Sequence, residues 1–149
     1  MPNVNLYIAA TARGPSVRKK AYYVYILEWM PGDSPYTRVG QGSMENVTEN
    51  QITLTALIEA LKRFTEPCDI TVYTECKHVI HSMMQAWPQH WNKCNWIKPA
   101  TGKPVQNKEL WKQILVLTKK HCIAWTDTDH SYKQWMMDEL KRMKEADNG

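Results

Sequence analysis

The sequence predicts an α/β (α+β) domain built on one five-stranded mixed sheet, with the first three strands antiparallel and helices on both faces. Three observations predict this class. Near the N-terminus, runs of β-favouring residues are joined by short gaps. After residue 47 the apolar residues recur at helical spacing, and short strands then alternate with helices. A meander of strands that continues into strand–helix crossovers forms a mixed sheet covered by helices.

Three strands are expected first. Residues 4–8 alternate between branched and other side chains, which is the period of a half-buried strand. Residues 21–29, Ala-Tyr-Tyr-Val-Tyr-Ile-Leu-Glu-Trp, are rich in aromatic and branched residues and predict the second strand. The turn cluster Pro-Gly-Asp-Ser-Pro at 31–35 leads into a third strand at 36–43. So short a gap makes the second and third strands antiparallel neighbours.

The first helix is predicted from a capping-box spacing at Thr48 and Gln51, followed by an apolar stripe that Pro67 closes. The order of the whole chain is therefore βββαβ, then helices, then βα. The other expected elements are strands at 70–74 and 122–125 and helices at 76–86, 107–120 and 131–146. We expect a single domain over residues 1–149, with a frayed tail at 143–149.

The composition excludes several classes of protein. With 43% hydrophobic and 23% charged residues, the chain is neither a disordered polyelectrolyte nor a membrane span. No apolar run approaches the roughly 18 residues that a spanning helix needs, and we expect no membrane partner. The four cysteines form no CxxC pair, which favours reduced thiols and a cytoplasmic protein.

The net charge is only +4, but the lysines gather in one part of the chain. Between residues 90 and 120 there are seven lysines and three tryptophans, and the only acid is Glu109. Basic side chains interleaved with flat aromatic rings are typical of nucleic-acid surfaces, because lysine neutralises phosphates while rings pack on sugars and bases. An amphipathic helix with its tryptophans in the core has the same pattern, so composition alone leaves both interpretations open.

Several stretches resemble the type 1 ribonuclease H family and together span nearly the whole chain. Asn-Gln-Ile-Thr-Leu at 50–54 is similar to the start of the family's first helix, and Val-Tyr-Thr-Glu-Cys at 72–76 is similar to its strand-ending motif. The spaced tryptophans at 87–96 and the run Lys-Pro-Val-Gln-Asn-Lys-Glu-Leu-Trp at 103–111 match the family's basic handle and the next helix. Asp-Glu-Leu at 138–140 matches the last helix.

The resemblance implies a ribonuclease H-like fold, whose family cuts the RNA strand of an RNA–DNA hybrid with two divalent metals held by four carboxylates. Carried over position by position, these carboxylates fall at Ala9, Thr53, Glu75 and Asp138. Two of the four acids are absent, so Glu75 and Asp138 are expected to be catalytic remnants that form at most a weak single Mg²⁺ or Mn²⁺ site. His130 could stand in for the family's loop histidine. No cofactor is expected to be required.

The same resemblance places a set of residues on the nucleic acid, so that recognition of an A-form backbone through phosphates and 2′-hydroxyls would be partly kept. For Trp87 a packing role is the alternative. The set consists of Thr48, Asn50, Lys77, Trp87, Trp91, Lys93, Trp96, Lys98, Lys103 and Asn107.

The expected function is a ribonuclease H-like domain that binds RNA–DNA hybrid or duplex through a basic handle and is catalytically inactive or crippled. One alternative is an active Mg²⁺- or Mn²⁺-dependent hybrid endoribonuclease with a rearranged site. Another is a protein-interaction or dimerisation module on the same fold, whose partner would be a polymerase, a mobile-element protein or a second copy. Hybrid cleavage separates the first two, and salt-dependent hybrid binding separates the first from the third.

Overall fold

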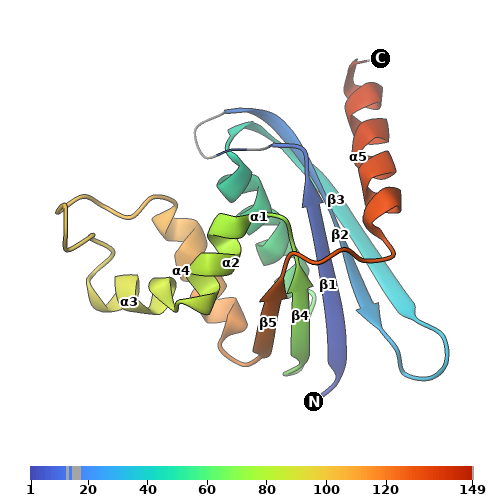
Figure 1. Cartoon of the computed structure of the whole chain (residues 1–149), viewed down its shortest axis with the longest axis horizontal. Helices are drawn as coiled ribbons and strands as arrows, with labels where there is room; N and C mark the ends of the chain where they lie inside the picture. The colour runs from blue at the N-terminus through green and yellow to red at the C-terminus, as the bar shows by residue number, and fades with distance from the viewer. Residues whose placement is uncertain (13, 15–17, 149) are drawn as a thin grey trace.

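The computed structural model describes residues 1–12, 14 and 18–148, which form a five-stranded sheet in the order β3-β2-β1-β4-β5 (Figure 1). The strands are β1 (Asn3–Ala10), β2 (Lys19–Trp29), β3 (Tyr36–Val47), β4 (Asp69–Tyr73) and β5 (Cys122–Thr126). β2 pairs antiparallel with both β1 and β3, whereas β4 is parallel to β1 and β5 is parallel to β4. The predicted mixed sheet with an antiparallel first half is confirmed.

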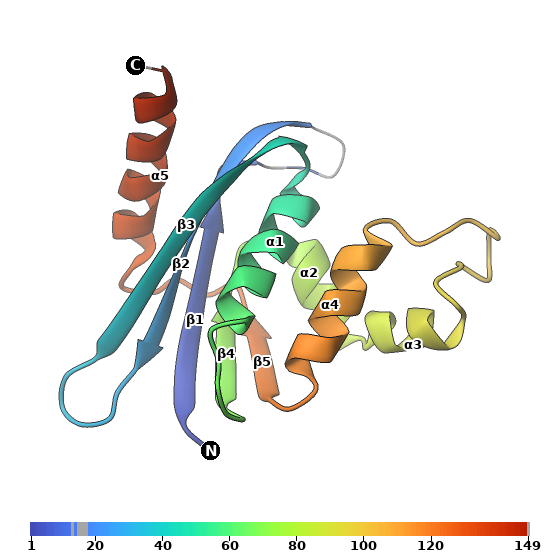
Figure 2. The same cartoon turned by 180° about the vertical axis from the view of Figure 1, so that it is seen from behind.

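Helices cover both faces of the sheet, as predicted. They are α1 (Glu49–Leu61), α2 (Lys77–Met84), α3 (Trp87–Lys93), α4 (Lys108–Thr118) and α5 (Lys133–Asn148). α1 and α4 lie on one face, and α5 packs on the other face over β1 and β2 (Figures 1 and 2). Each face has its own core, with Ile8 and Leu57 in the first and Val24 and Met136 in the second. No helix among the described residues is long and apolar enough to cross a membrane.

The ends of some elements differ from the sequence-based ranges. β3 is longer than expected, and the short helix α3 follows α2 almost directly. α5 continues to Asn148, so residues 143–148 are helical instead of frayed, and the last residue of the expected tail lies outside the described residues. Asp147 explains the longer helix: it accepts a hydrogen bond from the Tyr22 hydroxyl at 2.6 Å and pairs with Lys20 at 2.5 Å. These contacts tie the end of α5 to β2.

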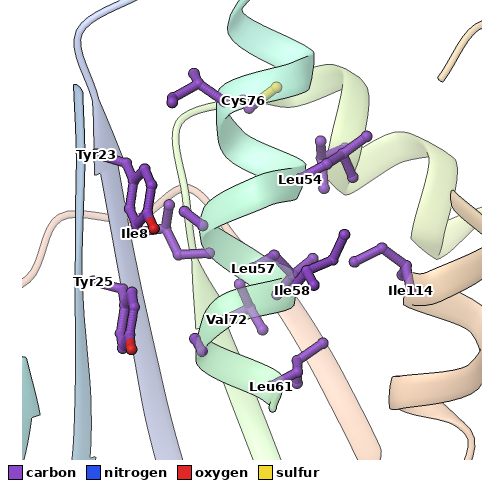
Figure 3. Close-up of a cluster of buried hydrophobic side chains, with 14 of the residues drawn as sticks. Ile8, Tyr23, Tyr25, Leu54, Leu57, Ile58, Leu61, Val72, Cys76 and Ile114 are labelled. Atoms are coloured by element: carbon purple, nitrogen blue, oxygen red, sulfur yellow. The ribbon is translucent and has the colours of Figure 1, made fainter. Parts of the chain in front are cut away.

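The pairing of β2 with β3 depends on glycine. Gly40 pairs with Tyr25 and Gly42 pairs with Tyr23. A Cβ atom at Gly42 would lie 2.7 Å from the Tyr23 hydroxyl oxygen, and one at Gly40 would overlap the Tyr25 ring. Figure 3 shows both rings beside the core under α1, near Ile8. The glycines therefore leave room for two tyrosine rings from β2 to cover this end of the core.

We predict that replacing Gly40 by alanine destabilises the fold by about 1–3 kcal/mol, the usual cost of overpacking a filled core. The Tyr25 ring is held in place, because it is buried and its hydroxyl accepts a hydrogen bond from Arg63 Nε. Gly32→Ala is the matched control, since no atom lies within 4 Å of the added methyl group. Urea denaturation measures both variants, and equal stabilities would contradict the role given to Gly40.

Candidate functional site

A small hollow opens where the parallel strands β1 and β4 end. Because both strands run in the same direction, their carboxyl ends meet at one edge of the sheet, where α/β sheets commonly bind ligands. β1 contributes Ala9, the segment after β4 contributes Glu75, and α1 contributes Thr53. Residues 127–130 and Lys133 at the start of α5 also line it. The fold therefore brings distant parts of the chain together at this edge.

Two of the positions that the resemblance assigns to carboxylates line the hollow without a charge. Ala9 lies on β1, the middle strand of the sheet, and Thr53 lies on α1. Thr53 is only 3% exposed and lines the hollow together with Cys76. Burial raises the pKa of Cys76, which keeps this thiol protonated. A methyl group and a buried hydroxyl supply none of the negative charge that a hard divalent cation requires.

Glu75 keeps an acid at the third of these positions, but it is paired with a lysine. Lys133 Nζ lies 3.4 Å from Glu75 Oε1 and 3.0 Å from Asp129 Oδ1. Hydrogen bonds to Asp129 and Glu75 raise the pKa of Lys133, so its ammonium group stays charged at neutral pH. Lys77 forms a similar pair with Asp127, at 3.0 Å. Acids around the hollow thus have lysine partners within the chain.

Asp138, the fourth expected position, is not brought into the hollow. Its carboxylate is exposed and accepts a hydrogen bond from Gln134 Nε2 at 3.0 Å. α5 packs on the sheet through Met136 and directs Met137 toward the hollow. Successive residues of a helix are rotated by about 100°, so Asp138 lies on the next face around α5. The expected pair of Glu75 and Asp138 is therefore not assembled.

His130 lines the hollow, but neighbouring rings hold it in place. Its ring centroid lies 4.4 Å from that of Tyr7 and 5.5 Å from that of Tyr73. Its Nδ1 accepts the backbone N–H of Tyr132 at 3.2 Å. Burial lowers the pKa of His130, which favours the neutral imidazole. His130 is thus part of an aromatic cluster between the sheet and the start of α5, a different role from that of a loop histidine free to move.

Glu28, near the end of β2, organises this aromatic cluster, and the sequence did not predict its role. Its carboxylate accepts hydrogen bonds from Tyr132 at 2.6 Å, Asn5 at 2.9 Å and Tyr7 at 3.1 Å. Burial acts to raise the pKa of Glu28, but these hydrogen bonds outweigh burial and the pKa is lowered. The available sequence signal was a lone acid in the apolar and aromatic run 21–29.

The lysine-rich segment projects from the body of the domain. α3 and the loop that joins it to α4 lead away from the sheet (Figures 1 and 2). Lys93, Lys98 and Lys103 are exposed along this segment. The backbone N–H of Lys98 donates to the Lys103 carbonyl at 2.8 Å, which brings the two lysines to the same part of the loop. We call residues 87–107 the handle.

The tryptophans of the handle mostly form its own core. Trp96 is 5% exposed, so its burial contradicts the expected contact with nucleic acid. Trp91 is partly buried and packs against Trp96 and Trp111, with ring centroids 6.4 Å and 5.7 Å away. Trp87 is 41% exposed, and its ring centroid lies 6.1 Å from that of Trp91. This placement is compatible with both expected roles of Trp87, packing and contact with nucleic acid. The rings anchor the handle to α4, and the lysines carry its charge.

Three polar residues expected on the nucleic acid are engaged inside the domain. Thr48 is buried, and its hydroxyl caps α1 by accepting the backbone N–H of Gln51 at 3.3 Å. Asn50 Oδ1 accepts a hydrogen bond from the Cys76 thiol at 3.3 Å. Asn107 Oδ1 accepts one from Gln51 Nε2 at 3.1 Å. These side chains join the starts of α1, α2 and α4, and their expected contact with nucleic acid stays a prediction.

Comparison with known proteins agrees with this architecture. The RNase H family profile matches residues 4–130. The chain belongs to the RNase H family. Ribonuclease H of Caldicellulosiruptor saccharolyticus is 36% identical over 112 residues, which is 70% of this chain and 74% of that protein. Ribonuclease H of Thermoanaerobacter sp. (strain X514) is 38% identical over 84 residues, and this match spans about half of each protein, 56% of this chain and 54% of the relative.

Solved RNase H structures share the fold. LC9-RNase H1, a type 1 RNase H with the type 2 active-site motif, superposes with a TM-score of 0.74 at 17% identity, over 95% of this chain and 70% of that chain. LC11-RNase H1, in complex with an RNA/DNA hybrid, superposes with a TM-score of 0.58 at 16% identity, over 92% of each chain. A foamy viral protease-reverse transcriptase in complex with dsDNA gives a TM-score of 0.63 at 16% identity, over 94% of this chain and 89% of that chain.

The side chains of this RNase H domain do not fit a two-metal site. In the described part of the chain, no three His, Cys, Asp or Glu side chains are grouped so that they could hold a metal ion. Divalent cations such as Mg²⁺ need several oxygen ligands, whereas Ala9 and Thr53 supply no carboxylate and Glu75 faces Lys133. Asp138, the other expected ligand of a weak single site, does not line the hollow with Glu75.

We predict that Glu28→Gln lowers the stability of this RNase H domain at neutral pH and flattens its loss of stability in acid. The hydrogen bonds that lower the pKa of Glu28 stabilise the folded state above the unfolded pKa, which is about 4.3 for glutamate. This contribution is lost as the pH falls through the lower folded pKa. Thermal denaturation from about pH 7 to about pH 3 compares the two proteins. Glu145→Gln, exposed on α5, is the control and should follow the wild type; coincident profiles for all three proteins would contradict the prediction.

Proposed function

We propose that this RNase H domain binds RNA–DNA hybrid or duplex nucleic acid and does not cleave it. The observation that carries the proposal is the set of side chains at the ends of β1 and β4. Ala9 and Thr53 stand at two of the family's acidic positions, and Glu75 at a third is paired with Lys133. Two-metal hydrolysis requires both cations to be held in place before the reaction. Because these side chains lack the carboxylates that would hold two cations, they support a domain that binds nucleic acid without cleaving it.

The handle supports the binding half of the proposal. Lys93, Lys98 and Lys103 are exposed on a segment that packed tryptophans anchor to α4, so their charges are presented together at one side of the domain. Lys77 offsets the negative charge of Asp127 at the rim of the hollow. Lysine contacts to phosphates depend on charge and position and need no catalytic carboxylate. The fold is also that of LC11-RNase H1, solved in complex with RNA/DNA hybrid, and is found in a foamy viral protease-reverse transcriptase solved in complex with dsDNA.

A second candidate function is hydrolysis of the hybrid by a rearranged set of acids. It is favoured by the relatives, which are named ribonuclease H. It is also favoured by the presence of Glu49, Asp127 and Asp129 around the hollow together with Glu75. Such an enzyme would need Mg²⁺ or Mn²⁺, and its lysine–carboxylate pairs would have to open before the acids could bind a cation.

Cleavage of a labelled RNA–DNA hybrid decides between these two functions. We predict no multiple-turnover cutting of the RNA strand in either Mg²⁺ or Mn²⁺, because no carboxylate stands at the positions of Ala9 and Thr53. The ribonuclease H of Caldicellulosiruptor saccharolyticus, prepared in the same way, is the positive control. Metal-dependent cutting by the protein purified free of host nuclease would establish the second function in place of the first.

The salt dependence of hybrid binding tests whether the lysines of the handle contact phosphates. If about three lysines contact phosphates, the logarithm of the binding constant should fall with the logarithm of salt concentration at a slope of about −2 to −3. Lys98→Ala with Lys103→Ala should weaken hybrid binding for all sequences alike and flatten the slope by about 2. Fluorescence anisotropy over a salt series measures both quantities. Stability should be nearly unchanged, because exposed lysines contribute little to folding.

The matched control changes two other exposed lysines, Lys119 and Lys120, which follow the last residue of α4, at the opposite end of this helix from the handle. This double alanine variant should keep the wild-type slope. A wild-type protein that binds neither hybrid nor duplex at about 50 mM salt, where phosphate contacts are strongest, would refute nucleic-acid binding and leave the protein-interaction module.

A further inference from the structure

We propose that Lys133 is a built-in cation that takes the place of a divalent metal in the hollow, so that nucleic acid binds this domain without Mg²⁺ or Mn²⁺. The inference rests on the proposed binding function, because it concerns the same surface and the same class of ligand. The inference follows from the position of the Lys133 ammonium group. Lys133 Nζ stands between a carboxylate of the segment after β4, Glu75, and a carboxylate of the loop after β5, Asp129, at 3.4 Å and 3.0 Å.

The position of Lys133 at the start of α5 indicates that the carboxylates of Glu75 and Asp129 hold its ammonium group in place. It is the first residue of α5, at the positive end of the helix dipole, where a cation is disfavoured. Two carboxylates from outside the helix offset that cost. The side chain of Lys133 is 45% exposed and is therefore accessible from solvent. A lysine in this position both neutralises the acids and can meet an approaching phosphate.

The other acids around the hollow also have partners within the chain. Lys77 Nζ lies 3.0 Å from Asp127 Oδ2. Glu49 Oε1 accepts the backbone N–H of Gly14 at 3.2 Å. A divalent cation entering the hollow would therefore have to displace existing ion pairs and hydrogen bonds. With neutral side chains at Ala9 and Thr53, it would gain no further carboxylate in return.

Loss of the lysine should expose the charge that it neutralises. In Lys133→Met, Glu75 and Asp129 lose their shared partner, and both would repel a backbone phosphate. A divalent cation could then neutralise them in place of the ammonium group. The wild type and the variant should therefore respond to metal in different ways, although neither is expected to cut the hybrid.

The first experiment measures hybrid affinity in EDTA and in Mg²⁺ at matched ionic strength. The wild type should change less than about twofold, whereas Lys133→Met should bind about tenfold more weakly in EDTA and recover most of that loss in Mg²⁺. Lys141→Met is the matched control, because it removes the same charge from an exposed position of the same helix. The proposal is overturned if the wild type requires Mg²⁺, or if Lys133→Met behaves like Lys141→Met.

A second experiment needs no nucleic acid and separates this inference from the proposed function. Mn²⁺ is titrated calorimetrically into Ala9→Asp, which restores one acidic side chain to the hollow, with and without Lys133→Met. Removing the lysine should tighten Mn²⁺ binding about tenfold or more, because the cation no longer competes with an ammonium group. Equal Mn²⁺ affinities would refute the role of Lys133. Absence of hybrid binding by the wild type would instead refute the proposed function.

Discussion

The parallel pairing of β1 with β4 is the constraint on which the rest of the domain depends. Its register pairs Val4 with Ile70 and Tyr7 with Tyr73, so the last residues of β1 lie beside the segment that follows β4. The residue near the end of β1, Ala9, therefore lies near the segment that follows β4, and both meet the start of α1 and the loop before α5. Because α1 and α5 pack on opposite faces, the hollow forms between their first turns.

Charge within this hollow is balanced by the chain's own lysines. In a two-metal enzyme, several carboxylates offset the repulsion between two cations, and losing acids leaves both cations weakly held. Here Ala9 and Thr53, at two positions that the resemblance assigns to acids, are neutral, and Lys77 and Lys133 neutralise acids around the rim. The half-exposed ion pairs add little to stability. Their main consequence is electrostatic, since they reduce the negative charge that a nucleic-acid backbone would meet.

The tryptophans and the lysines of the handle have different structural roles. Trp91, Trp96 and Trp111 pack together, so the segment keeps a defined position on α4 although it stands away from the sheet. The lysines on its outside stay exposed, where they can exchange water and counterions for phosphates. A basic, tryptophan-rich stretch thus contains a small core and a charged surface. The packing of its tryptophans confirms the core interpretation of its composition, and contact of its lysines with nucleic acid stays a prediction.

The sequence by itself determined the order of strands and helices, because apolar periodicity is a local property of the chain. Motif spacing is also local, and it was enough to show that Ala9 and Thr53 stand where the resemblance places acids. Tertiary structure alone decided which acids share the hollow. Asp138 belongs to a motif that resembles the family's, but the rotation of α5 turns it away from the hollow. Lys133 and Glu75 are far apart in the sequence and meet only because β4 and α5 converge at one sheet edge. Charge pairing and burial depend on distances in space, which no spacing along the chain encodes.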